Sequence, residues 1–186
     1  YKRSLALMGY TPKIIERIKV NPTQEELTEG TIAVYLEQRS IKQVVVNGVT
    51  YNVGGKFDMV ADGILHDFKS TTAYSWLFGT RDEDYKLQGS LYRWLNPDKI
   101  TEDFIRIAFI FTDWQKMQAK TNPAYPQHRI LHKDIELMSI EETERWIQAK
   151  ILQVHNFKDL PEEKIPECTD AELWRSDPQF KYYADP

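Results

Sequence analysis

The sequence predicts an α/β domain whose mixed central β-sheet contains an antiparallel meander and is flanked by helices. The dipeptides Asn47-Gly48 and Asp62-Gly63 each separate two β-type segments, and both favour a two-residue type I′ turn between antiparallel strands. The run Phe104–Thr112 is almost continuously apolar, which is typical of a strand buried on both faces. Residues 82–95 follow a helical pattern, so strands and helices alternate along the chain.

The composition suits one compact domain. The chain has 186 residues, of which 41% are hydrophobic, so we treat 1–186 as one domain and expect 157–186 to be a C-terminal extension that wraps around it. The formal net charge of −4 excludes a uniformly basic nucleic-acid-binding surface. Because no apolar run approaches a membrane span and no secretory leader is visible, we expect a cytoplasmic protein without membrane contact. Cys168 is the only cysteine, which excludes an internal disulfide and an iron–sulfur cluster.

The elements before the first turn are two short helices and a long strand. Leu5–Met8 continues an N-terminal helix, and Ile14–Val20 predicts a second one. A polar connection then leads to the long strand Val34–Val46, which turns at Asn47-Gly48 into the strand Val49–Val60.

After the hairpins, residues 70–80 contain three aromatic side chains, which either belong to the core or stack on unpaired bases. They are Tyr74, Trp76 and Phe78. The helix Asp82–Leu95 has acidic residues in its first turn and is stopped by Asn96-Pro97. The partly basic loop Asp113–Arg129 either guides DNA or is an ordinary connection. The strand Ile130–Leu137 follows, and a capping signal at Ser139 begins a helix that runs to about Asn156.

The turn at Asp62-Gly63 fixes a register that brings two carboxylates together. It pairs Met59 with His66 and therefore places Asp58 opposite Asp67, with Cβ atoms roughly 5 Å apart. Like charges at that distance repel, and a divalent cation would reverse the penalty. Strand alternation puts Lys69 on the same face as Asp67.

The turn at Asn47-Gly48 extends this argument by one strand. It pairs Glu37 with Asp58, so three acidic residues would form one row across three strands. The next row on that face would hold Arg39, Lys56 and Lys69. A bulge at Gly54-Gly55 would instead turn Glu37 to the opposite face.

Gln88 and Tyr92 stand four residues apart in the predicted helix and therefore project from one face together. The buried stripe of that helix lies on a neighbouring face. It comprises Leu87, Leu91, Trp94 and Leu95.

Three motifs now stand in order: G-x-x-D from Gly55 to Asp58, D-x-K-S-T from Asp67 to Thr71, and Q-x-x-x-Y from Gln88 to Tyr92. This pattern, spanning about Glu29 to Asn96, resembles the PD-(D/E)xK nuclease superfamily and specifically its RecB-like and phage-exonuclease branch. The resemblance implies a restriction-endonuclease-like core.

The resemblance also implies a role for each matching residue. Asp58 and Asp67 would bind Mg²⁺ or Mn²⁺ with the backbone carbonyl of Phe68, and Lys69 would assist the attacking water. Glu37 is a further candidate ligand, on register alone. DNA would be contacted by the residues of the helix and the neighbouring strand. These are Gln88, Tyr92 and Lys56.

The implied function is that of a metal-dependent deoxyribonuclease. We expect an exonuclease that acts on linear single- or double-stranded DNA in end processing, recombination or repair. Its protein partner would be a recombination protein or a second copy of the chain. The alternatives are a non-catalytic nucleic-acid- or protein-binding module that kept the fold, and an oligomeric structural protein in which the acidic row is a surface feature.

RecB-like nucleases carry a further metal-binding histidine in a G-T-x-x-H pattern. Gly30-Thr31 matches its start, but Val34 stands in the histidine position. Either a segment carrying that histidine precedes Tyr1, which we expect because the chain opens inside a predicted helix, or the protein manages without it.

Overall fold

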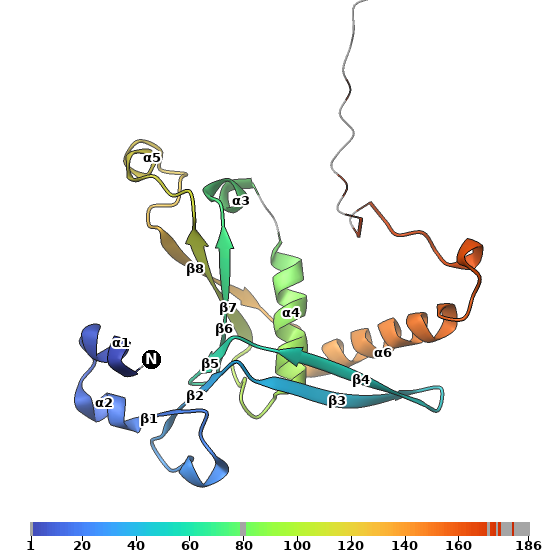
Figure 1. The fold of residues 1–186 in the computed structure, drawn as a ribbon, viewed down its shortest axis with the longest axis horizontal. Coiled ribbons are helices and arrows are strands. Elements are labelled where there is room, and N and C mark those ends of the chain that lie inside the picture. The colour runs from blue at the N-terminus through green and yellow to red at the C-terminus, as the bar shows by residue number, and fades with distance from the viewer. Residues whose placement is uncertain (1, 79–80, 171, 174, 176–179, 181–186) are drawn as a thin grey trace, which may run out of the picture.

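The computed structural model describes residues 2–78, 81–170, 172–173, 175 and 180. They form an α/β fold with a mixed six-stranded sheet flanked by helices, as predicted (Figure 1). Along the sheet β1 pairs with β2 and β6 pairs with β7 in parallel, and the other neighbours are antiparallel. In spatial order the strands are β1 (Ile18–Val20), β2 (Ile32–Leu36), β5 (Met59–Ala61), β6 (Ile64–Thr71), β7 (Phe104–Phe111) and β8 (Ile130–Glu136).

The two predicted long strands are each divided in two. Their outer halves, β3 (Arg39–Val46) and β4 (Val49–Lys56), form a separate two-stranded sheet that projects from the domain (Figure 1). The chain leaves β2 at Glu37, whose φ of 54° lies in the left-handed region, and this bend ends the strand. Continuous strands from 34 to 46 and from 49 to 60 were therefore a wrong prediction.

The register within these strands is nevertheless the predicted one. Asn47 and Asp62 have φ of 51° and 50°, and the glycines that follow them also have positive φ, as type I′ turns require. Val46 pairs with Val49, and the same alignment continues through Ser40 with Gly55. Gly54-Gly55 therefore contains no bulge.

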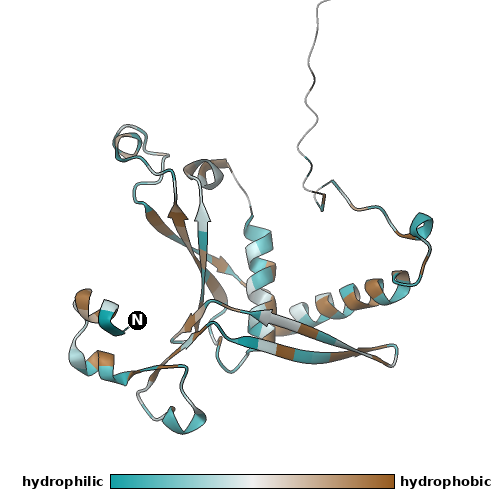
Figure 2. Ribbon diagram, in the orientation of Figure 1, coloured by the Kyte–Doolittle hydropathy of each residue, from teal (hydrophilic) through white to brown (hydrophobic). Residues whose placement is uncertain are grey.

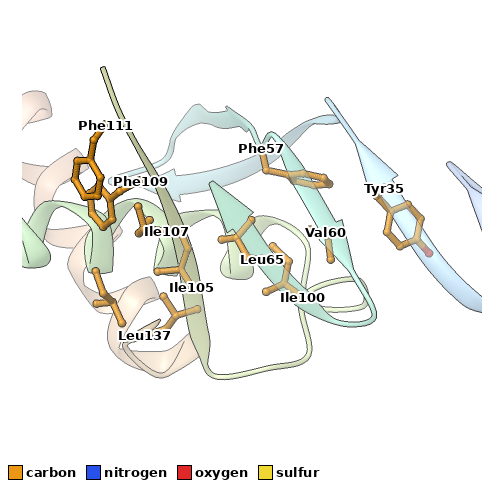
Figure 3. Packing of buried hydrophobic residues seen from close by; sticks show 11 residues of the cluster. Tyr35, Phe57, Val60, Leu65, Ile100, Ile105, Ile107, Phe109, Phe111 and Leu137 are labelled. Carbon is orange, nitrogen blue, oxygen red and sulfur yellow. The ribbon is translucent and has the colours of Figure 1, made fainter. Parts of the chain in front are cut away.

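The main core lies between one face of the sheet and the helices that cover it, α3 (Ala73–Phe78) and α4 (Asp82–Leu95). Alternate side chains of β7 point into it, which is the period-two pattern of a strand, and Leu65 of β6 joins them (Figure 3). Its buried members are Tyr35, Phe57, Val60, Leu65, Ile100, Ile105, Ile107, Phe109, Phe111, Ile135 and Leu137.

Gly89 lets α4 approach the sheet closely. A Cβ at this position would lie 2.7 Å from Leu137 Cδ2 and 3.0 Å from Ile105 Cβ, so a larger residue would push the helix away. The close approach of α4 also brings Gln88, the residue before Gly89, near the strands. The predicted helix bounds are confirmed, and Trp94 is the fully buried member of the predicted stripe, whereas its leucines are partly buried.

Two smaller clusters complete the packing. The helices α1 (Lys2–Leu7) and α2 (Pro12–Arg17) cover the other face of the sheet at its β1–β2–β5 end, where Leu5, Ile18 and Val34 are buried. Helix α6 (Ile140–Phe157) packs on α4 and on the β3–β4 hairpin, and hydrophobic and hydrophilic residues alternate along it (Figure 2). It starts with the capping box predicted at Ser139.

Two local predictions were wrong. The segment predicted as a helix from Ile14 to Val20 is helical only to Arg17, because Ile18–Val20 instead pairs as β1 with β2, where Ile18 is buried. The predicted loop 113–129 contains the helix α5 (Lys116–Thr121). The segment between α5 and β8 is held against the start of the loop, since Trp114 Nε1 donates a 2.8 Å hydrogen bond to the carbonyl of the buried Pro126.

The remaining described elements are the short 3₁₀ helices η1 (Gln24–Glu26) and η2 (Glu162–Lys164). Residues 161–170 of the predicted wrapping extension are exposed, and residues 171, 174, 176–179 and 181–186 of it lie outside the described residues. Within the described part of the chain, no helix is long and apolar enough to cross a membrane.

Candidate active site

The hairpin β5–β6 brings Asp58 and Asp67 together. Met59 pairs with His66 as predicted, so Asp58, just before β5, lies beside the strand that carries Asp67. The Phe68 backbone N–H donates a 3.2 Å hydrogen bond to Asp58 Oδ2. This bond ties the first carboxylate to the strand of the second.

Asp67 is almost fully buried, with 4% of its surface exposed. Its Oδ1 accepts a 3.1 Å hydrogen bond from Gln88 Nε2, and its Oδ2 lies 2.7 Å from Lys69 Nζ. Burial raises the pKa of this carboxyl group above its ordinary value, and the charge of Asp58 adds to the rise, whereas Lys69 and Gln88 act against it. The ionised form of Asp67 is therefore less stable, relative to the protonated form, than in an exposed aspartate.

Lys69 projects from the same face of β6, two residues after Asp67. Its Nζ is also 3.5 Å from Gln88 Oε1 and 5.6 Å from the centre of the Tyr85 ring. The side chain is 29% exposed, so the ammonium group is reachable from solvent while it stays paired with Asp67.

Gln88 and Tyr92 occupy one face of α4, as predicted, and they join it to the aspartates. Gln88 Nε2 is shared between Asp67 Oδ1 and the Tyr92 hydroxyl, which is 3.3 Å away. The Tyr92 ring packs against Gly55 of β4, which has no side chain to obstruct it. The helix, the projecting hairpin and β6 meet at these side chains.

Glu37 and Lys56 lie apart from this cluster. The predicted pairing of Glu37 with Asp58 exists in the backbone, because Glu37 N donates to Asp58 O at 2.9 Å. The side chain of Glu37, however, is 63% exposed and forms an ion pair with Lys56. Among the described residues, no group of three or more His, Cys, Asp or Glu side chains is arranged to hold a metal ion. The structure therefore gathers two carboxylates and not the predicted row of three.

The two aspartates form a donor set that fits Mg²⁺ or Mn²⁺. Mg²⁺ is commonly held by one or two carboxylates, with water and substrate phosphates completing its shell. Asp67 Oδ2 is buried and has no partner with hydrogen-bond geometry, although Lys69 forms an ion pair with it. A cation beside this oxygen would satisfy it and would offset the repulsion between the carboxylates.

Sequence reasoning missed a cavity of about 250 Å³ next to Lys69. Lys133 of β8 reaches it across two strand spacings, together with Trp76 of α3 and Tyr85 of α4. No local pattern could have indicated Lys133, because its place depends on the order β6–β7–β8. Trp76 packs edge-on against Phe109 at the border of the core and also lines this cavity, while Tyr74 and Phe78 are exposed.

The fold and site thus define an α/β domain with a buried aspartate, a second aspartate and a lysine at the edge of a hairpin. No protein-family model matches the sequence, and no curated protein matches it. The chain is similar to a solved structure described as "Crystal structure of SSO0001", with 18% sequence identity and a TM-score of 0.43. The match covers 64% of this chain and 50% of that protein, so this chain spans about half the length of that protein.

Proposed function

We propose that the protein is a metal-dependent nuclease that hydrolyses phosphodiester bonds in DNA, acting as an exonuclease on linear molecules. One observation carries the proposal: Asp67, Lys69 and Gln88 converge within hydrogen-bond distance beside Asp58, although they come from two separate elements. This is the arrangement that the motif resemblance implies for a PD-(D/E)xK site.

Each residue has a part in hydrolysis. Asp58 and Asp67 would hold Mg²⁺ or Mn²⁺ with the Phe68 carbonyl, and the bound ion would lower the pKa of water and offset charge on the phosphate oxygens. Lys69 is placed to orient the water or to stabilise the transition-state anion with its ammonium group. In the reaction a P–O bond to the water oxygen forms, the P–O bond to the next sugar breaks, and the leaving oxygen takes up a proton.

Gln88 has a positioning role. Its amide donates hydrogen bonds to Asp67 and to the Tyr92 hydroxyl. The bond to Asp67 fixes the orientation of this carboxylate, which burial has removed from most of the solvent. Tyr92, which accepts from the Gln88 amide, and Lys56, which follows Gly55 at the base of the hairpin, would contact the DNA strand. Local contacts of this kind are needed because the net charge of −4 gives no general attraction for DNA.

A non-catalytic DNA-binding module is the second candidate. The 2.7 Å ion pair between Lys69 and Asp67 favours it, because such a pair can serve the fold alone. The two candidates differ in whether DNA is consumed.

End-labelled single-stranded, double-stranded and circular DNA, incubated with the full chain and Mn²⁺, would test the proposal. We expect linear DNA to be degraded, EDTA to stop the reaction, and Asp67→Asn to abolish it. The exposed Asp98→Asn is the matched control and should keep full activity. Binding of DNA without metal-dependent degradation would contradict the nuclease and favour the binding module.

A further inference from the structure

A second feature of the molecule is the cavity beside Lys69, which is lined by residues of the C-terminal end of β6, of α3 and of the start of α4. We call it the Lys133 pocket. It is lined by Lys69, Thr71, Trp76, Arg81, Tyr85 and Lys133, among others. Lys69 is shared with the candidate active site, so any group bound in the pocket lies directly beside the proposed reaction centre.

The charges of the pocket suit a phosphate group. Among the described residues that line it, three are cations, Lys69, Arg81 and Lys133, and one is a carboxylate, Asp82. Each cation is paired with a carboxylate, Lys69 with Asp67, Arg81 with Asp84 and Lys133 with Asp82, so a phosphate would compete with these partners. Lys133 Nζ lies 2.6 Å from Asp82 Oδ2, and both side chains are more than 40% exposed. Exposed ion pairs contribute little free energy, so a phosphate can compete for this lysine at small cost. Hydroxyl groups of the β6 end, including that of Thr71, add further hydrogen-bond donors.

Two aromatic side chains, Trp76 and Tyr85, also line the pocket. Trp76 and Tyr85 are half-buried, and each is packed edge-on against Phe109, with ring centres 5.2 Å and 6.0 Å from it. This packing fixes their orientation while part of each ring faces the pocket. Aromatic side chains held in this way stack with bases of any sequence.

The size of the pocket limits what can enter. Its volume of about 250 Å³ is smaller than the roughly 300–1,000 Å³ of sites for drug-sized ligands. A space of this size suits one nucleotide unit of a DNA strand. A strand that continued in both directions would have to leave the pocket.

We propose that the Lys133 pocket binds a nucleoside monophosphate unit, with the phosphate on the cations and the base on Trp76 and Tyr85. The inference rests on the proposed nuclease function for its biological meaning: the unit is the terminal nucleotide of the strand being cut. The pocket then requires a chain end, and each hydrolysis releases a mononucleotide.

Binding to the full chain in EDTA tests the pocket without the reaction. Titration calorimetry with dAMP, deoxyadenosine and inorganic phosphate separates its two halves, and dAMP should bind more tightly than either fragment. Lys133→Ala should weaken dAMP binding about tenfold, as the loss of a charge-assisted contact predicts. Asp82→Asn should strengthen it, because the competing carboxylate is removed. Lys150→Ala, an exposed lysine of α6, is the control and should change nothing.

The products of the wild-type reaction give the second readout. Mononucleotides, together with competition by free dAMP, would support the pocket as the site of the terminal nucleotide. Oligonucleotide products without dAMP binding would overturn the pocket while the nuclease stands. Binding of dAMP that depends on Lys133, without degradation of any DNA, would support the nucleotide site and overturn the proposed nuclease. Equal affinity of the parent for dAMP and for inorganic phosphate would overturn the role of the aromatic side chains. Equal affinity of Lys133→Ala and the parent for dAMP would overturn the phosphate site.

Discussion

Gly55 of β4 lies directly against the ring of Tyr92 in α4, and a Cβ built on Gly55 would be 2.8 Å from Tyr92 Cε1. The missing side chain thus lets the base of the projecting hairpin meet the helix. Because the Tyr92 hydroxyl accepts a hydrogen bond from Gln88, this contact also supports the group that orients Asp67.

Gly55→Ala should therefore displace Tyr92 and destabilise the fold by about 1–3 kcal/mol, which is the usual cost of overpacking. Urea denaturation would measure this. Gly54→Ala is the matched control, since its Cβ would contact the exposed and adaptable Ile41 side chain at 3.2 Å, and it should cost less than about 1 kcal/mol. Equal losses for the two variants would contradict a specific contact with Tyr92.

Lys69→Ala should abolish hydrolysis and leave Mn²⁺ binding intact, because the lysine is placed to act on the water and the phosphate and is not a metal ligand. Calorimetric titration with Mn²⁺ and an assay of DNA degradation would separate the two effects. Lys150→Ala should behave as the parent in both. If Lys69→Ala kept nearly the turnover of the parent, the assignment of Asp67–Lys69 as a nuclease D-x-K motif would be wrong.

Gln88→Ala should cost about 1–3 kcal/mol of stability, because Asp67 Oδ1 would lose its hydrogen bond inside the protein. It should also raise the pKa of Asp67, since the bond from Gln88 favours the ionised form. Thermal denaturation and NMR titration of the carboxyl group are the measurements. The exposed Gln148→Ala should show neither effect. An unchanged pKa in Gln88→Ala would show that the contact does not orient the carboxylate.

Asp67 should make the stability of the protein fall as pH rises. Its pKa is raised in the folded state, so the folded protein binds this proton more tightly than the unfolded chain, and ionisation destabilises the fold. The penalty is absent below the unfolded value near 3.8 and is complete above the folded pKa. The gain in stability of Asp67→Asn over the parent should therefore be larger at pH 7 than at pH 4.

Asp134 provides a comparison of opposite sign. The hydrogen bonds that it accepts from Arg106 lower its pKa, so its ionised form stabilises the fold at neutral pH. This contribution is lost as pH falls through the folded pKa. Asp134→Asn should therefore destabilise the protein more at pH 7 than at low pH. The same pH trend for both variants in urea denaturation would contradict the difference between these carboxylates.

Mn²⁺ should stabilise the folded protein if Asp58 and Asp67 hold it. Metal at about 100 times its Kd contributes roughly 2.7 kcal/mol, which is visible as a shift in Tm. Asp58→Asn should lose this shift. Glu37→Gln should keep it, because the Glu37 carboxylate is engaged by Lys56. A smaller Mn²⁺-induced shift in Tm for Glu37→Gln than for the parent would show that Glu37 does contribute to metal binding.

The sequence by itself determined the parts of the site that depend on short stretches of chain. The type I′ turn at Asp62-Gly63 fixed the register that puts Asp58 beside Asp67, because such a turn needs two consecutive residues with positive φ. Strand alternation then placed Lys69 with Asp67, and helical periodicity placed Gln88 with Tyr92. These relations require only the local geometry of a hairpin or a helix.

The tertiary structure alone decided how those pieces meet. The bend at Glu37 divides the long strands and frees this carboxylate to pair with Lys56, and neither event follows from a strand pattern. Gln88 reaches Asp67 because Gly89 lets α4 lie close to β7 and β8, and Lys133 enters the pocket because β8 pairs with β7. Such contacts join residues far apart in sequence, and their positions depend on the packing of the whole core, which no local period encodes.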